Sequence, residues 1–256
     1  MSLKICSFAS GSRGNCCYIS DGSTDLLIDL GISALAAERC LKAVGANPDR
    51  IAVAITHSHS DHIGGLKVFC KKHAGTTLFC QRECVSEINY GTGITPTVVG
   101  RVFTVGTITV HAVPVSHDVP CFGYIVESGG KSVAVVTDTG CISLDALGAM
   151  SSCGVVMIEA NHDPARLRAN PRYSYQVKTR IASNHGHLSN GDCAAACAYL
   201  ARNGVRSFIL AHLSEENNLP ELAVSEVKRG IERTGITGVS VIAATQNAMT
   251  GLYEVC

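Results

Sequence analysis

The chain has 256 residues, of which 46% are hydrophobic and 16% are charged, and its formal net charge at pH 7 is zero. This composition excludes a disordered chain, and the balanced charge lacks the global basic excess common in nucleic-acid binders. No apolar run approaches the roughly 20 residues of a membrane helix, and the first ten residues resemble a strand rather than a signal peptide, so we expect a soluble cytoplasmic protein.

Apolar, β-branched runs bounded by turn residues predict strands, and apolar residues at helical spacing predict helices. The predicted strands lie near residues 3–8, 16–20, 25–30, 51–55, 76–80, 102–105, 107–113, 122–127, 131–137, 155–159, 206–211 and 239–243. The predicted helices lie near 33–44, 62–73, 81–89, 143–149, 190–203 and 219–234. Asn190 is the expected N-cap of the helix near 190, and Gly204 is expected to end it. No stretch resembles an interdomain linker, so residues 1–256 are predicted to form a single domain.

Thirteen cysteines are present, and no two of them form a Cys-x-x-Cys pair. In a reducing compartment such residues behave as small buried hydrophobes. We therefore expect neither a disulfide framework nor a thiolate metal site.

The segment AITHSHSDHIGG holds four candidate metal ligands within six residues: His57, His59, Asp61 and His62. On an extended strand end His57 and His59 point the same way, because side chains two residues apart share one side. Imidazole and carboxylate ligands suit zinc, iron or manganese. So dense a group of polar side chains predicts a metal site.

A basic segment runs from Pro164 to Arg180 without any acidic residue, and it includes Arg166, Arg168 and Arg172. Two interpretations stay open. The segment is either a solvated surface or a contact for the phosphate backbone of a nucleic acid, which needs only a local basic patch.

The His-x-His-x-Asp-His pattern resembles the signature of the metallo-β-lactamase superfamily. That resemblance implies an α/β fold, a four-layer αβ/βα sandwich of two mixed β-sheets flanked by helices. Four further segments match the family in order, each at a predicted strand end: LLIDLG with Asp29, VPVSHD with His117, VVTDTG with Asp138 and ILAHLS with His212. The resemblance implies two divalent ions (Zn, Mn or Fe) with the ligands His57, His59, Asp61, His62, His117, Asp138 and His212, and it makes Asp29 the residue that orients the metal loop.

Transfer-RNA 3′-processing nucleases of this superfamily carry two more motifs, and MIEANHD and HGHLSNGD are similar to them. The resemblance makes His187 a catalytic histidine that Glu159 holds, although a loop-stabilising His187 is the alternative. His185 has no matching role, and His162 stays unassigned.

Eight segments together, from FASGSRGNCCYIS to LAHLSEENN, are similar to the WalJ/YycJ-like bacterial branch. That branch implies 5′-to-3′ exonuclease activity on double-stranded DNA, with DNA rather than RNA as the expected nucleic-acid partner. Asp61, His187 and Glu159 are the implied catalytic residues, and two metals would activate the attacking water. The oligomeric state stays undecided.

The loop from Ser10 to Asn15 resembles the family's short turn near the metals, and its backbone could meet phosphate or merely form a hairpin turn. Two other functions stay open for the chain. One is a small-molecule hydrolase of esters, thioesters or cyclic phosphodiesters, and the other is a non-catalytic metal-binding regulator.

Overall fold

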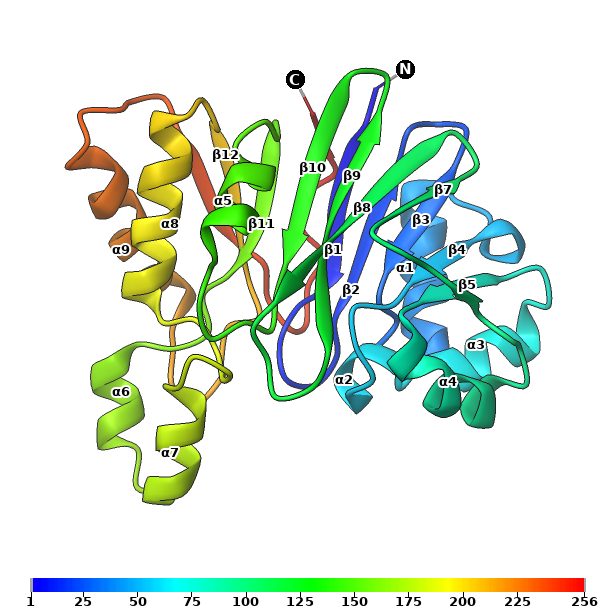
Figure 1. The fold of residues 1–256 in the computed structure, drawn as a ribbon, viewed down its shortest axis with the longest axis horizontal. Coiled ribbons are helices and arrows are strands. Elements are labelled where there is room, and N and C mark those ends of the chain that lie inside the picture. Colours follow the sequence, from blue (N-terminus) through cyan, green and yellow to red (C-terminus); the bar gives the residue numbers. More distant parts are fainter. Residues whose placement is uncertain (1, 256) are drawn as a thin grey trace. The chain divides into compact units, whose positions relative to one another are not determined.

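The computed structural model describes residues 2–255, which form two mixed seven-stranded sheets with flanking helices (Figure 1). The predicted fold class is therefore confirmed. The first sheet has the order β14–β1–β2–β3–β4–β5–β6. Its strands are β1 (Lys4–Ala9), β2 (Cys16–Ser20), β3 (Asp25–Ile28), β4 (Ala52–Ala54), β5 (Thr77–Cys80), β6 (Thr97–Val98) and β14 (Tyr253–Glu254).

The second sheet has the order β13–β12–β11–β10–β9–β8–β7. Its strands are β7 (Val102–Val105), β8 (Ile108–Val115), β9 (Cys121–Ser128), β10 (Lys131–Val136), β11 (Val155–Glu159), β12 (Ser207–Ala211) and β13 (Ser240–Ala243). The strands β10, β11, β12 and β13 pair in parallel, so their carboxyl ends lie at one edge. This edge receives several of the predicted site residues.

The helices are α1 (Ala34–Val44), α2 (Ser60–Ile63), α3 (Leu66–Lys72), α4 (Val85–Thr92), α5 (Leu144–Met150), α6 (Pro164–Ala169), α7 (Tyr175–Ile181), α8 (Asn190–Arg202) and α9 (Pro220–Glu232). Short 3₁₀ turns cover Pro48–Arg50 and Arg82–Cys84. Among residues 2–255, no helix combines the length and apolarity that a lipid bilayer would require.

The chain divides into two compact units, each assembled from separate segments. Unit 1 contains Met1–Ala112, Val126–Lys131 and Gln246–Cys256, and unit 2 contains Val113–Ile125 and Ser132–Thr245. Each unit has its own apolar core: strands β1–β5 pack with α1 and α3 in unit 1, and strands β10–β13 pack with α5, α8 and α9 in unit 2. The single domain expected from the sequence stays a prediction.

Most predicted elements agree with the structure, and the differences have local causes. The helix predicted over 62–73 is divided into α2 and α3 at Gly64 and Gly65. A Cβ on Gly65 would lie 1.9 Å from the carbonyl oxygen of Ile32, so glycine is needed for this close approach of two backbones.

The predicted N-cap of α8 is wrong by one residue. Ser189 caps the helix, because its hydroxyl oxygen accepts a hydrogen bond from the amide of Asp192 at 3.1 Å. Asn190 is instead buried, and its side-chain amide donates to the Oδ1 of Asn218 at 2.9 Å.

The twelve cysteines among the described residues are all free thiols, and ten of them are buried.

Candidate metal centre

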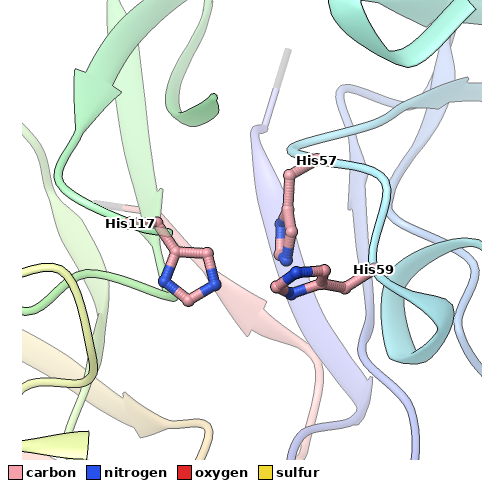
Figure 2. Close-up of side chains that lie close together, drawn as sticks. All are labelled: His57, His59 and His117. Carbon is pink, nitrogen blue, oxygen red and sulfur yellow. The ribbon is translucent and has the colours of Figure 1, made fainter. Parts of the chain in front are cut away.

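The first cluster of candidate ligands lies in unit 1, on the loop after β4 and the short helix α2 that follows it. The ring centroids of His57 and His59 are 4.6 Å apart, and those of His57 and His62 are 4.1 Å apart. Figure 2 shows His57 and His59 on this loop, together with His117 on the loop after β8. His57 and His62 are fully buried, so their nitrogens are held in fixed positions by the surrounding core.

Asp29 supports this cluster from the end of β3. Its carboxylate accepts hydrogen bonds from the amide and the hydroxyl of Thr56, each at 2.8 Å, and one oxygen lies 2.7 Å from Nδ1 of His62. An ionised carboxylate only accepts, so Nδ1 of His62 donates and the lone pair is left on Nε2. Such a contact fixes the tautomer and ring orientation that a metal ligand needs.

Asn15 connects Asp61 to the same cluster. Its side-chain amide nitrogen lies 3.3 Å from Oδ2 of Asp61 and 3.0 Å from Nε2 of His62. Ser10 and Asn15 are both buried, and the Ser10 hydroxyl lies 3.5 Å from Oδ1 of Asn15. The loop from Ser10 to Asn15 therefore holds candidate ligands in place. Its contact with substrate stays a prediction.

Replacing Gly31 by alanine is expected to displace Asp61. An added Cβ would lie 1.7 Å from the carbonyl oxygen of Asp61, which is backbone and has little room to move. We expect a loss of about 1–3 kcal/mol in unfolding free energy and a lower content of bound metal, measured by denaturant titration and elemental analysis. The control is Gly100→Ala, because nothing lies within 4 Å of the Cβ position there. Equal stability and metal content in the two variants would contradict the expectation.

The second cluster lies in unit 2, at the carboxyl ends of three neighbouring parallel strands. Asp138 follows β10, Glu159 ends β11 and His212 follows β12. Nδ1 of His212 lies 2.8 Å from Oδ1 of Asp138 and 3.2 Å from Oε1 of Glu159. With His187, one ligand atom from each of these four residues lies within 4.8 Å of the others. The parallel strands thus bring together residues up to 74 positions apart (212 − 138 = 74).

Three non-glycine residues among those described have positive φ angles, and all three are candidate site residues within two positions of a strand end. The φ angles are 62° for Asp29, 56° for Asp138 and 52° for His212. Left-handed backbone costs free energy in residues with a Cβ, and it persists where surrounding contacts enforce it, commonly at functional sites. The positive φ angles therefore support the prediction that these residues belong to a functional site.

His187 is held by Glu159. Nδ1 of His187 lies 2.8 Å from Oε1 of Glu159, whose other oxygen accepts hydrogen bonds from the amides of Thr139 at 2.8 Å and Leu188 at 3.3 Å. Burial opposes ionisation of Glu159, but the charge and hydrogen bond of His187 outweigh it and hold its pKa below the ordinary value. Burial likewise opposes protonation of His187, but the Glu159 carboxylate outweighs it and raises the pKa of His187. The pair thus favours an ionised carboxylate beside a protonated imidazole.

The remaining predicted site residues have different surroundings. Nε2 of His117 lies 3.2 Å from a carboxylate oxygen of Asp118. Burial lowers the pKa of His117, which favours the neutral form that can bind a metal. His185 is exposed, with Nδ1 3.0 Å from the hydroxyl of Ser116. Sequence reasoning missed Thr56, whose hydroxyl joins Asp29 to the histidine loop; a threonine directly before the His-x-His pair was the available signal.

The basic segment forms the short helices α6 and α7, which extend beyond one end of α8 within unit 2 (Figure 1). The Arg166 and Arg168 side chains are exposed, whereas Arg172 pairs with Glu216 at 2.6 Å. Nζ of Lys178 donates to the carbonyl of Arg168 at 2.7 Å and so links the two helices. The segment is a structured, solvent-exposed projection.

A family model and several known proteins are similar to this chain. Residues 24–213 match the family model described as a β-lactamase superfamily domain. The chain is 35% identical over 244 residues to exodeoxyribonuclease YycJ of Bacillus anthracis, an alignment that covers 92% of this chain and 91% of that protein.

Two solved structures have a similar fold. The metallo-β-lactamase fold protein YhfI from Bacillus subtilis superposes with a TM-score of 0.73 at 15% identity, over 99% of this chain and 100% of that one. The short form of human tRNase Z superposes with a TM-score of 0.64 at 15% identity, over 97% of this chain and 98% of that one.

Proposed function

Since this chain belongs to the metallo-β-lactamase superfamily, in its WalJ/YycJ-like branch, and is a metal-dependent hydrolase, we propose that it is an exonuclease that degrades double-stranded DNA in the 5′-to-3′ direction. One structural observation carries the proposal. The His187 side chain is 22% exposed and is held by the fully buried Glu159, at the strand ends that also bear Asp138 and His212. A partly exposed imidazole beside candidate metal ligands, with its pKa raised by the Glu159 carboxylate, is suited to donate a proton to a leaving oxygen.

The donor groups fit a divalent metal. They are imidazole nitrogens and carboxylate oxygens, the set that suits Zn, Mn or Fe. The contact of His62 Nδ1 with Asp29 places the lone pair of the ring on Nε2, which is the arrangement of a ligating histidine. We propose that His57, His59, Asp61, His62, His117, Asp138 and His212 are the ligands of two ions.

The protein's own residues have distinct tasks in the proposed reaction. Bound divalent ions would lower the pKa of water toward neutrality and neutralise charge on the phosphodiester. Glu159 accepts a hydrogen bond from Nδ1–H of His187, so the transferable proton of the imidazolium is the one on Nε2. We expect Nε2 to transfer that proton to the departing sugar oxygen, while Asp61 orients the attacking water.

The direct test is degradation of duplex DNA, labelled at the 5′ or the 3′ end, by purified protein with Mn²⁺. We expect short labelled products to appear early only from the 5′-labelled strand, with little turnover of a matched RNA duplex and none in excess EDTA. Absence of cleavage of either nucleic acid, by protein that elemental analysis shows to hold metal, would overturn the nuclease proposal.

The small-molecule alternative has some structural support, because unit 2 contains a cavity of about 460 Å³ beside His117 and Cys141. Such volumes are typical of small-ligand sites. Hydrolysis of a small phosphodiester or ester, without cleavage of DNA, would favour that function.

We propose that the basic projection contacts the DNA backbone through Arg166, Arg168 and Arg172. Replacing Arg166 and Arg168 by alanine is expected to weaken DNA binding. It should also flatten the dependence of log Kd on log salt by up to about 0.9 for each phosphate that the protein no longer neutralises. The measurement is fluorescence anisotropy of labelled duplex from low to moderate salt, with EDTA present to prevent cleavage.

The matched control removes two exposed arginines elsewhere in unit 2, Arg202 and Arg233. It lowers the net charge equally but leaves the projection intact. An unchanged salt slope in the Arg166→Ala, Arg168→Ala variant, or an equal change in the control, would remove the projection from the DNA-binding surface.

A further inference from the structure

A cavity of about 510 Å³ lies within unit 2, on the side of His187 formed by α8 and the loop after Asp138. Its walls include Cys141, His162, Ala195 and His187. The cavity therefore opens beside the residue that the proposed function makes the proton donor. Its volume falls in the range that accommodates a small organic group.

His162 lies on the wall of this cavity and carries a polar atom without a partner. The residue is 2% exposed, and its Nδ1 has no hydrogen-bond partner among the described residues. Burial lowers the pKa of His162, so the ring is neutral and offers one donor and one acceptor. A buried polar atom without a partner costs roughly 1–3 kcal/mol, so the fold leaves the hydrogen-bonding capacity of this histidine partly unused, and a ligand in the cavity can contact its ring.

The lining indicates which ligand fits. Apart from His187, whose proposed task is to donate a proton, it contains no cationic side chain, and its carboxylate, Asp192, accepts a hydrogen bond from the hydroxyl of Ser189 at 2.6 Å. This electrostatic environment disfavours a phosphate group. Apolar walls from Ile142 and Ala195, with the polar edges of His162 and Asn184, match a flat, uncharged ring that has hydrogen-bonding edges.

We propose that this cavity binds the nucleobase of the nucleotide whose oxygen departs from the scissile phosphate. The proposal rests on the proposed nuclease function, because His187 connects the cavity to the reacting bond. A base must leave the helical stack to enter such a cavity, which costs a few kcal/mol and least where the base is unpaired. The frayed end of a duplex meets that condition, and an internal base pair does not, so the cavity would favour cleavage from an end.

Binding can be tested without catalysis through Cys141, which is the exposed thiol among the described cysteines. We expect millimolar deoxynucleosides to slow alkylation of Cys141 by iodoacetamide several-fold, as measured by mass spectrometry of the Cys141 peptide. The effect should vanish in Ala195→Phe, where a ring fills the cavity from an exposed position on α8. It should persist in Ala198→Phe, three residues further along α8 and outside the lining.

A second variant separates the role of His162 from a structural one. Replacing His162 by leucine removes no hydrogen bond made by Nδ1, so we expect the variant to unfold at the wild-type temperature. We expect deoxynucleosides to no longer protect Cys141 in this variant. On duplex DNA, Ala195→Phe should reduce kcat/KM at least about tenfold for a paired or unpaired terminal base. It should have little effect when the terminal nucleotide is abasic.

The outcomes distinguish the two proposals. Cleavage of DNA without protection of Cys141 by any deoxynucleoside, and with normal kinetics in Ala195→Phe, would overturn the base-binding cavity and leave the nuclease intact. Protection that depends on Ala195 and His162, in a protein that cleaves no nucleic acid, would support the cavity as a nucleoside site and overturn the nuclease function.

Discussion

Replacement of Asp61 by alanine is expected to reduce the rate of DNA cleavage by about a thousandfold or more. Asp61 lies in the first turn of α2, and its carboxylate is 20% exposed beside Nε2 of His62, at 3.5 Å. As a ligand it would help position a cation that contributes several kcal/mol of transition-state stabilisation, and each 1.36 kcal/mol corresponds to a tenfold change in rate. The measurements are single-turnover cleavage of 5′-labelled duplex and the metal content of the purified variant.

Asp49→Ala is the matched control for this variant. Asp49 also contacts a histidine, with Oδ1 2.7 Å from Nδ1 of His73, but that pair lies outside both ligand clusters. We expect Asp49→Ala to retain wild-type cleavage and metal content. Wild-type cleavage by Asp61→Ala would contradict the assignment of Asp61 as a ligand and as the residue that orients water.

Replacement of His187 by alanine is expected to slow cleavage by about 10²–10⁴-fold while metal content stays unchanged. The reason is loss of the proton donor rather than of a ligand. The reduction in cleavage rate should be much smaller for a phosphodiester with a nitrophenolate leaving group, because that anion departs without protonation. Glu159→Gln should cause a similar defect on DNA, because the neutral amide no longer favours protonated His187.

His185→Ala provides the control, since His185 lies two residues away on the same loop and its ring contacts only Ser116 among the hydrogen bonds of the described residues. We expect it to cleave DNA at nearly the wild-type rate. An equal loss for both leaving groups in His187→Ala would show a positioning role in place of proton donation. Loss of bound metal in His187→Ala would instead make His187 a ligand.

Local patterns in the sequence predicted most of the secondary structure, because strands such as β2 and β11 are short apolar runs with turn residues on both sides. The same patterns missed α6 and α7. These helices are only 6 and 7 residues long, and α7 buries no residue, so they lack the apolar stripe that reveals a helix. The two-residue strands β6 and β14 are likewise too short to show any alternation.

The sequence by itself determined the family and the first cluster of candidate ligands, because four candidate ligands within six residues need no long-range contact to be recognised. Tertiary structure decided which residues hold them: Asp29, 33 residues from His62, orients its ring, and Asn15 reaches Asp61 across 46 residues. It also decided that Asp138, Glu159 and His212 meet, through the parallel pairing of β10, β11 and β12. The pairing order of strands and the burial of side chains arise from long-range packing, and no short pattern of residues encodes them. For the same reason, only the folded chain shows that Nδ1 of His162 has no hydrogen-bond partner.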